Sequence, residues 1–419
     1  MMKKNVLFWI MLVWTGVLFA QNTIYSTANK TYSDYLRTKA EYGDPLAMND
    51  LGSCLDRGAG IEQNHSEALE WFKKAAAAGN LFAQYNLGLY YHRGIATTKD
   101  YTKALYWYEK AAQQNSTFTP VLQALGNMYY KGEGVDKDYA KALYWYEKAA
   151  QQNFYVAQYD LGNMYYKGEG VDKDYTKALY WYEKAAQQNF SVAQYALGNM
   201  YLYGRGTNVD YNKAIFWHEQ AANQNYLYSM DALANCYMRM KDYVHAVQWL
   251  QKAYDKGLLI VCHNLADMYY YGNGVEQSYE KAFEIFSKGK DNPFCMYRLA
   301  VMLRSGLGTK VDNVQANALL SEAASKGVAK AQYQLAIDCY TGEHHDRDYK
   351  MAVANFEKAL IDQYLLSDIK SDIYRKLSAC YRFGRGVKSD KAKADEYMKL
   401  AAELGDPDAQ KIQEWLMVR

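Results

Sequence analysis

The chain has very little proline and no excess of charge of either sign. Only 4 of its 419 residues are proline and 28 are glycine, so long disordered linkers are not expected. Lysine and arginine together number 48, and aspartate and glutamate number 46, which gives a formal net charge of +2. A protein that binds nucleic acid needs a basic face, so this balance argues against a nucleic-acid partner.

Cysteine is sparse and irregularly placed. The six cysteines include no CxxC pair, and their scatter suggests no disulfide framework. Whether any of them form disulfides stays open at this point.

Long apolar runs are absent after the first twenty residues. Lys3 and Lys4 precede an apolar run from Val6 to Phe19, which the small residue Ala20 closes. This run is short for a membrane span, so we predict a cleaved secretory signal peptide; an uncleaved anchor is the alternative. Cleavage removes two lysines and leaves 46 basic and 46 acidic side chains. We therefore expect an exported chain, periplasmic or secreted, without a transmembrane segment after cleavage.

What the chain does have is an internal repeat of 36 residues. The segments 125–153 and 161–189 differ at one position only, Ala140 against Thr176, and looser copies extend from about residue 44 to residue 406. A period of this length indicates stacked supersecondary units, each in contact mainly with its neighbours.

The copy at residues 154–189 has the pattern of two helices joined by a glycine loop. Ala157, Leu161 and Tyr165 lie four residues apart, as on one face of a helix. Glycine tolerates backbone angles that other residues resist, so Gly168 and Gly170 should end this helix, and Asp174 is placed to cap the next one. The second helix has its apolar residues at helical spacing: Ala178, Trp181, Tyr182, Ala185 and Ala186.

Three further slots of the repeat are restricted. One slot holds only Gly or Asn, the residues that best tolerate a left-handed helix end: Gly43, Gly79, Asn115, Asn153, Asn189, Asn225, Gly257, Gly327 and Gly405. A second slot is small, which predicts the close approach of another helix: Gly52, Gly88, Gly126, Gly162, Gly198, Ala234, Ala266, Ala300, Ala336 and Ser378. The third slot sets the register and holds Trp71, Trp107, Trp145, Trp181, Trp217 and Trp249. Cys54, Cys236 and Cys380 take the place of Met128 and Met164, which predicts small apolar fillers.

These residues resemble the Sel-like repeat (SLR), a branch of the tetratricopeptide superfamily. The resemblance rests on Ala157, Leu161-Gly162, Tyr165, Gly168 to Val171, Asp174, Ala178, Trp181-Tyr182 and Ala185-Ala186, and it extends over nearly all of the chain after residue 20. It implies an all-α fold, an α/α right-handed superhelical solenoid of about ten helix–loop–helix repeats with capping helices. It also implies a scaffold that binds proteins or peptides in a concave helical groove, such as an envelope or host-interaction adaptor. The expected boundaries are a signal peptide at 1–20, an N-terminal segment with a capping helix at 21–43, the solenoid at 44–406 and a C-terminal capping helix at 407–419.

Two rows of first-helix residues are candidate binding residues. Asparagine is a mediocre helix former whose amide both donates and accepts hydrogen bonds, and tyrosine is favoured at binding surfaces. The alternative for the asparagine row is that duplication copied a solvated residue. The alternative for the tyrosine row is that the rings are partly buried between helices. The rows are Asn127, Asn163, Asn199, Asn235 and Asp267, and Tyr130, Tyr166 and Tyr270.

No pattern supports a catalytic site, a metal or a cofactor. His344-His345 with Asp346 and Asp348 has no second cluster to complete a metal site, and solvated loop is the preferred interpretation. SxxK occurs at residues 278–281, 287–290 and 367–370 without SDN or KTG, so a β-lactamase-like penicillin-binding hydrolase is the least favoured alternative. Peptidoglycan or glycan binding through tyrosines is the second alternative to a protein or peptide partner. We predict a non-enzymatic binding scaffold.

Overall fold

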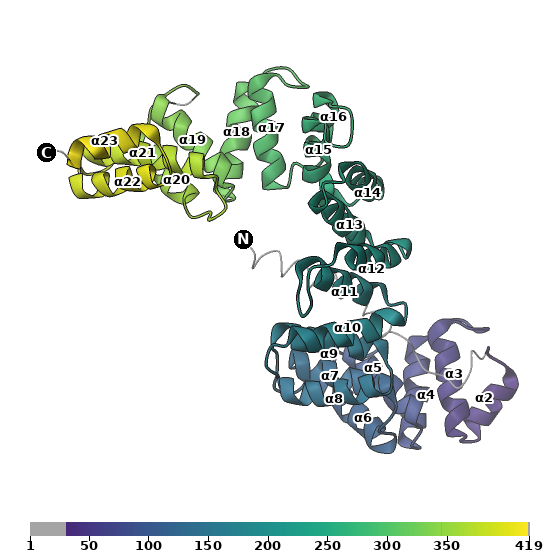
Figure 1. Ribbon diagram of the computed structural model, residues 1–419. Helices are drawn as coiled ribbons and strands as arrows, with labels where there is room; N and C mark the ends of the chain where they lie inside the picture. Colours follow the sequence, from purple (N-terminus) through teal and green to yellow (C-terminus); the bar gives the residue numbers. More distant parts are fainter. Residues whose placement is uncertain (1–30, 345, 418–419) are drawn as a thin grey trace. The chain divides into compact units, whose positions relative to one another are not determined.

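The computed structural model describes residues 31–344 and 346–417, so the signal peptide predicted at residues 1–20 lies outside the described part. The described residues form helices and no strand, and the helices follow one another as ten pairs (Figure 1). In chain order the paired helices are α3 (Pro45–Arg57) with α4 (His65–Ala77), α5 (Leu81–Arg93) with α6 (Tyr101–Gln114), α7 (Thr119–Lys131) with α8 (Tyr139–Gln151), α9 (Tyr155–Lys167) with α10 (Tyr175–Gln187), α11 (Ser191–Tyr203) with α12 (Tyr211–Asn223), α13 (Leu227–Arg239) with α14 (Tyr243–Asp255), η1 (Leu259–Val261) and α15 (Cys262–Tyr271) with α16 (Tyr279–Lys288), α17 (Pro293–Ser305) with α18 (Asn313–Ser325), α19 (Ala329–Thr341) with α20 (Tyr349–Ala359), and α21 (Ser367–Phe383) with α22 (Lys391–Glu403).

One further helix stands at each end of the series of pairs. Helix α2 (Asp34–Glu41) packs on α3, and α23 (Pro407–Met417) packs on α22. The chain divides into two compact units, and the division falls between Ala232 and Leu233, inside α13. We call them the first and the second unit and describe each by itself.

The cap and the loop of each pair follow from particular residues, as α9 and α10 show. Helix α9 ends at Gly168, whose φ of 76° is a left-handed value that favours glycine. The side chain of Asp174 then accepts hydrogen bonds from the backbone N–H groups of Thr176 and Lys177 at 3.0 and 2.9 Å. Because these N–H groups have no partner inside the helix, the cap stabilises the start of α10.

The small slot contacts an aromatic ring of the second helix. A Cβ atom on Gly162 would stand 2.7 Å from the Cδ1 atom of Tyr182, which is closer than such atoms approach. The predicted close approach is therefore confirmed, and it occurs within one pair of helices. The same packing joins Gly52 to Phe72, Gly88 to Tyr108, Gly126 to Tyr146 and Gly198 to His218.

The Gly/Asn slot has the predicted backbone in all its members except one. Asn153, Asn189 and Asn225 have φ values of 59°, 62° and 62°, and the glycines of the slot also have positive φ. The prediction was wrong for Asn115, which has a φ of −142°. Extra residues follow it before α7, and its side-chain oxygen accepts a hydrogen bond from the backbone N–H of Thr117 at 2.9 Å. The longer connection removes the need for a left-handed residue there.

A ladder of amide side chains joins successive pairs in the first unit. Gln188, which follows α10, donates to the side-chain oxygen of Gln158 in the same repeat at 2.8 Å and to that of Asn153, at the end of the preceding repeat, at 3.2 Å. One repeat later, Gln224 makes the same two contacts with Gln194 and Asn189, at 2.8 and 3.0 Å. Each repeat therefore satisfies polar groups of its predecessor, which couples neighbours as expected for a solenoid.

The core consists mainly of alanine, leucine and the aromatic residues that face the small slot. Tyr108, Tyr146 and Tyr182 are buried, whereas Trp107, Trp145 and Trp181 before them are only partly buried. The tryptophans therefore mark the register, but the next residue fills the centre of each pair. All six cysteines are buried, which agrees with the filler interpretation of Cys54, Cys236 and Cys380.

Candidate binding face

The predicted asparagine row lies on the first helices, partly buried against the second helices. The hydroxyl of Tyr146 donates to the side-chain oxygen of Asn127 at 2.6 Å, and the hydroxyl of Tyr182 donates to that of Asn163 at 2.8 Å. These bonds anchor two buried tyrosines. Asn199 has a histidine, His218, in place of that tyrosine, and it keeps only the hydrogen bond to Tyr195 that Asn163 likewise makes to Tyr159. A binding role for the row stays a prediction, but Asn127 and Asn163 also hold the fold together.

The predicted tyrosine row contacts the glycine loop of the following repeat. Tyr130 donates from its hydroxyl to Glu169 at 2.6 Å and accepts from the ammonium group of Lys167 at 3.0 Å. Burial, and then the hydrogen bond to Glu169, hold the pKa of Tyr130 well above its usual value, so the phenol stays neutral. One repeat later the loop residue is Arg205, whose guanidinium lies over the ring of Tyr166 at 5.2 Å from its centre. The row thus presents tyrosine rings beside charges of both signs.

Asp160 is influenced by the charges of the two lysines that end α7 and α9. Gln123 donates to it at 2.6 Å, and Lys131 and Lys167 are close enough to interact with its charge. Burial raises the pKa of Asp160 to about 6, although the hydrogen bond from Gln123 and the two lysines oppose that shift. We call Tyr130, Lys131, Asp160, Tyr166 and Lys167 the first-helix face of the first unit; the buried Gln123 holds Asp160 from within. Sequence analysis identified only the two tyrosines.

In the second unit, an arginine brings two predicted residues together. Arg298 forms an ion pair with Asp267 at 2.7 Å, and its guanidinium lies 5.0 Å from the ring centre of Tyr270. The sequence offered no signal for this arrangement, because Arg298 stands one repeat after its partners. Asn235, the remaining predicted residue, is half-buried on α13.

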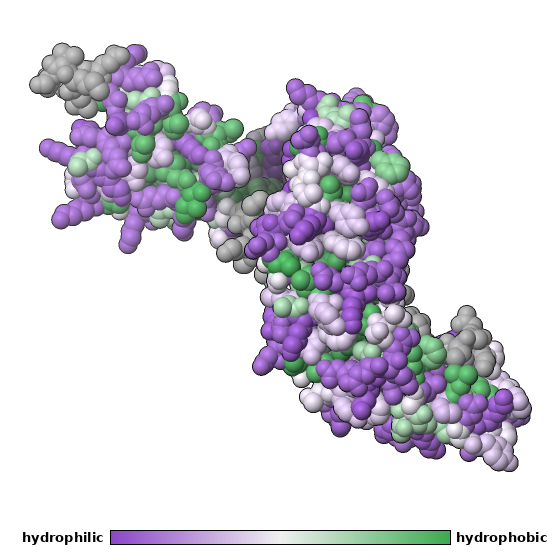
Figure 2. All heavy atoms as spheres, turned by 60° about the horizontal axis from the view of Figure 1, so that its bottom comes forward, coloured by the Kyte–Doolittle hydropathy of each residue, from purple (hydrophilic) through white to green (hydrophobic). Residues whose placement is uncertain are grey.

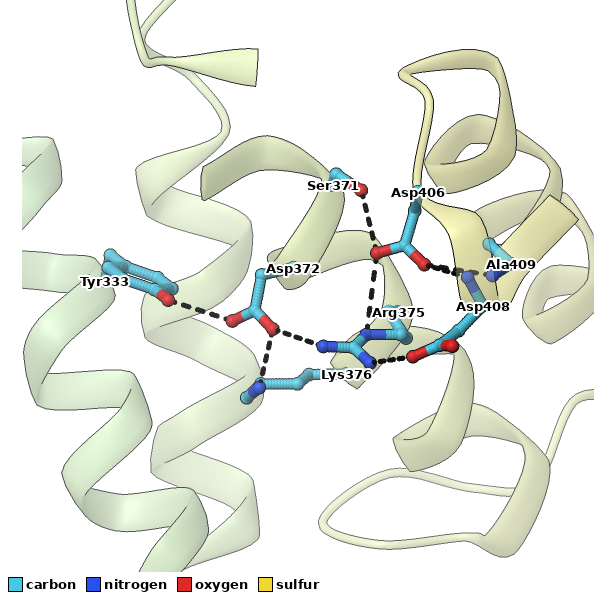
Figure 3. A network of polar contacts seen from close by, with 8 residues as sticks. All are labelled: Tyr333, Ser371, Asp372, Arg375, Lys376, Asp406, Asp408 and Ala409. Atoms are coloured by element: carbon cyan, nitrogen blue, oxygen red, sulfur yellow. Dashed lines mark hydrogen bonds and ion pairs between the residues drawn. The ribbon is translucent and has the colours of Figure 1, made fainter. Parts of the chain in front are cut away.

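The last helices of the second unit are joined by a network of polar contacts (Figure 3). Arg375 on α21 reaches Asp372 at 3.1 Å and also Asp408, at the start of α23, at 3.1 Å. Asp372 in turn accepts from the hydroxyl of Tyr333 on α19 at 2.9 Å and from Lys376 at 2.7 Å. Burial alone would raise the pKa of Asp372, but Lys376, Tyr333 and Arg375 together lower it below its usual value. The network therefore connects α19, α21 and α23.

The patterns set aside as catalytic have structural roles where the structure describes them. Ser278 accepts from the backbone N–H of Lys281 and caps α16, and Ser287 donates to the carbonyl of Phe283 at 2.7 Å. Among residues 31–344 and 346–417, no group of three or more His, Cys, Asp or Glu side chains could hold a metal ion. In the same part of the chain, no helix combines the length and apolar character of a membrane span.

Sequence analysis missed a row of exposed aromatic residues on the second helices of the first unit. The residue before four of the tryptophans is aromatic and about half exposed, with fractions of 50% to 52% for Tyr106, Tyr144, Tyr180 and Phe216. Each of these rings lies edge-on to the following tryptophan, with centres 5.0 to 5.1 Å apart. The signal was present in the repeat, but periodicity alone does not show which of two adjacent aromatic residues faces solvent. On the face shown in Figure 2, apolar side chains form small groups among polar ones.

Comparison with known protein families agrees with this architecture. The model of the Sel1 repeat matches ten consecutive segments: residues 45–80, 81–116, 122–154, 156–190, 191–226, 230–258, 260–292, 293–328, 329–360 and 373–406. The chain belongs to the Sel1 repeat family. The predicted all-α solenoid and the predicted SLR family are both confirmed, and a scaffold of this family is typical of protein–protein interaction.

Two solved structures show how far the similarity extends. The chain is similar to c5321, a protective antigen of uropathogenic Escherichia coli strains with an SLR fold: 28% of residues are identical, 91% of this chain and 82% of that chain are covered, and the TM-score is 0.77. It is also similar to a Sel1 repeat protein from Oxalobacter formigenes, with 32% identity over 53% of this chain and 98% of that chain, and a TM-score of 0.47. No curated protein matches the chain.

Proposed function

We propose that the chain is an exported scaffold that binds a protein or peptide along the first-helix face of its first unit. The observation that supports this most is a tyrosine beside charged loop groups in two successive repeats. Tyr130 lies beside Lys167 and Glu169, and 36 residues later Tyr166 lies beside Arg205. Tyrosine and arginine are favoured in protein interfaces, and an extended partner would meet an aromatic ring beside a charge in both repeats.

Two observations support export to the envelope or to a host interface. Residues 1–20 have the basic start, apolar run and small closing residue of a signal peptide. The similar protein of uropathogenic Escherichia coli is described as a protective antigen, which agrees with a protein that the host encounters. Fractionation of cells and N-terminal sequencing of the mature chain would test this part. A chain that keeps residues 1–20 and stays with cytoplasmic markers would contradict it.

The binding face can be tested with two matched photoreactive positions. Tyr203 ends α11, beside Arg205, and is 47% exposed, whereas Tyr180 on α10 is 51% exposed. Each can be replaced in turn by benzoylphenylalanine, which is also aromatic. We expect crosslinks to a protein or peptide from Tyr203 and not from Tyr180. Crosslinks from Tyr180 alone would place the partner on the second helices and overturn the proposed face.

Glycan binding is a second candidate, favoured by the exposed aromatic row on the second helices. Tyr106, Tyr144 and Tyr180 present half of their surface at the repeat spacing, and Lys110, Lys148 and Lys184 each lie within 5.6 Å of one ring centre. Binding to isolated peptidoglycan should then be lost in the Tyr144→Ala/Tyr180→Ala double variant. A Thr176→Ala/Lys177→Ala variant, on the same helix α10, serves as its control.

A further inference from the structure

One position of the repeat is alanine in nine repeats and glycine in the tenth, and two cysteines lie beside that glycine. Four residues after the tryptophan slot, nine of the ten repeats have a buried alanine: Ala75, Ala111, Ala149, Ala185, Ala221, Ala253, Ala323, Ala359 and Ala401. The remaining repeat has Gly289, which follows α16 directly. Its φ of −88° is ordinary, so the backbone does not require glycine there.

The neighbours of Gly289 explain why an alanine would not fit. A Cβ atom on Gly289 would stand 2.6 Å from the Cβ of Cys262 and 3.1 Å from the sulfur of Cys295. The sulfur of Cys262 would be 3.3 Å from the same point. Since 3.1 and 3.3 Å add to 6.4 Å, the two sulfurs lie no more than 6.4 Å apart. Both side chains are fully buried.

The second cysteine is also a departure from the repeat. Cys295 begins the core of α17 at a position where five other repeats have alanine: Ala47, Ala83, Ala157, Ala193 and Ala331. Compared with the other repeats, residue 289 therefore lacks a methyl group and residue 295 carries an additional sulfur atom. Cys262 belongs to α15, in the preceding repeat, and α15 and α17 are in contact. The three residues Cys262, Gly289 and Cys295 therefore form one packing unit across the junction of two repeats.

We infer that Cys262 and Cys295 are a disulfide site that links the seventh repeat to the eighth. The two side chains come from different first helices, so a bond between them would hold the two repeats in register. In forming it, each thiol loses one proton and one electron, a sulfur–sulfur bond forms, and a disulfide oxidant is reduced to two thiols. The inference rests on the proposed export, because structural disulfides persist in oxidising compartments.

The bond has to form while the chain folds. Burial raises the pKa of Cys295 to about 12 and also raises that of Cys262, so the folded pair offers almost no thiolate to an oxidant. In the unfolded chain both thiols are accessible. An oxidant present during folding can therefore react with the two thiols before they are buried.

Refolding tests the site without relying on the cell. The full chain is unfolded with reductant and refolded in a buffer of reduced and oxidised glutathione; its thiols are then alkylated, and its peptides are mapped by mass spectrometry. We expect one disulfide, between Cys262 and Cys295, and four alkylated cysteines. Six alkylated cysteines, or pairs that include Cys54, Cys236, Cys339 or Cys380, would overturn the inference.

Variants distinguish a disulfide between Cys262 and Cys295 from two reduced cysteines that only pack beside Gly289. Reductant should lower the melting temperature of the refolded chain by roughly 5 °C or more, and should leave Cys295→Ala unchanged. Cys236→Ala and Cys380→Ala, each at another buried cysteine, should keep the response. Gly289→Ala should reduce the yield of the disulfide, because the added methyl group occupies the space between the sulfurs. Equal melting temperatures with and without reductant would show that the glycine only makes room for two thiols.

The refolding and cellular experiments together distinguish an error in the proposed disulfide from an error in the proposed export. A disulfide that forms on refolding but is absent from the chain isolated from cells would contradict export and leave the site intact. A chain that is exported, yet keeps both thiols after refolding and in cells, would contradict the site and leave export intact.

Discussion

The two units build the same repeat with different polar contacts. In the first unit, successive repeats are joined by amide pairs such as Gln188 with Asn153, which recur with little change as Gln224 with Asn189. In the second unit they are joined by ion pairs that occur once each, such as Arg298 with Asp267 and Arg304 with Asp338. The first unit also has charged contacts between repeats, such as Gln123 with Asp160, but its amide ladder is neutral and recurs, whereas the two ion pairs named in the second unit differ from each other.

This difference predicts how substitutions reduce the stability of each unit. A ladder of neutral hydrogen bonds should depend little on salt or pH. An ion pair depends strongly on its burial, since charges removed from water are costly when a partner is lost. Substitutions in the two units should therefore differ in size and in their response to solution conditions.

The largest effect is expected from breaking the most buried ion pair. The side chain of Asp338 is 1% exposed and lies 2.6 Å from a guanidinium nitrogen of Arg304. Asp338→Ala leaves that guanidinium buried without its charge partner, so we expect a loss of about 3–5 kcal/mol in the free energy of unfolding of the second unit. Urea denaturation measures it. The double variant Arg304→Met/Asp338→Leu should recover most of the loss, and a loss below about 1 kcal/mol in the single variant would show that the pair is dispensable.

Overpacking of the small slot should be the next largest effect. Gly162→Leu would place its side chain in the ring of Tyr182, and we expect a loss of about 1–3 kcal/mol. Thr176→Leu on α10 adds a leucine at an exposed position of the same repeat and serves as the control. An unchanged melting temperature for Gly162→Leu would contradict the packing of this slot.

One repeat of the first unit should respond to pH. His218 stands where Tyr146 and Tyr182 stand in earlier repeats, and neither of its ring nitrogens has a hydrogen-bond partner among the described residues. Burial lowers the pKa of His218 from its usual 6.5 to about 3. Between pH 6.5 and 3 the unfolded chain binds the proton and the folded chain does not, so stability should fall as pH falls, by up to about 1.4 kcal/mol per pH unit.

The contribution of His218 can be isolated with one variant. Asp160 and Asp231 have pKa values raised to about 6 by burial, so their contributions have the opposite sign as pH falls from 6 to 4. The measured quantity is therefore the difference in unfolding free energy between the unmodified chain and His218→Phe at each pH. A difference that does not change between pH 7 and 5 would contradict the prediction.

Restoring the consensus residue should have a smaller, stabilising effect. His218→Tyr replaces an unpartnered imidazole by a hydroxyl that can donate to Asn199, as Tyr182 donates to Asn163 at 2.8 Å. We expect a gain of about 0.5–1.5 kcal/mol at pH 7, measured by thermal or urea unfolding. The His218→Phe variant supplies the ring without the hydroxyl, and equal stability of the two variants would remove the hydrogen bond from the explanation.

The smallest effect is expected at the partly exposed network of α21 and α23. Arg375 is 39% exposed, so its contacts with Asp372 and Asp408 are weakened by solvent. Arg375→Met should cost about 0.5–1 kcal/mol and should increase hydrogen exchange in α23 at low salt. Lys399→Met removes an exposed charge of α22 and provides the comparison. If the exchange of α23 is unchanged at low salt, the network does not hold this helix.

Much of the fold could be predicted from the repeat because its constraints are local. A slot restricted to Gly and Asn indicates a left-handed backbone, and an aspartate before a helical pattern indicates a cap; Asn153 and Asp174 confirm both. Asn115 shows the limit, since its backbone depends on the length of the next connection and not on its own identity.

The candidate site was harder to predict because it depends on neighbours on other helices, in the same repeat or in the next. Asn127 and Asn163 were selected for their pattern, yet the tyrosines that donate to their oxygens come from the second helix of the same repeat. Asp160 and Arg298 escaped notice because each occurs in a single repeat and has its partner in another.

The sequence by itself determined the family, the helical pairs and their register, since these follow from spacing and backbone preference along one chain. The tertiary structure alone decided which polar groups are shared between repeats, which aromatic residue of each pair faces solvent, and which two cysteines meet beside Gly289. The reason is that burial and contact depend on two packed surfaces together. The periodic pattern of the sequence describes the surface of one helix and does not show which surface packs against it.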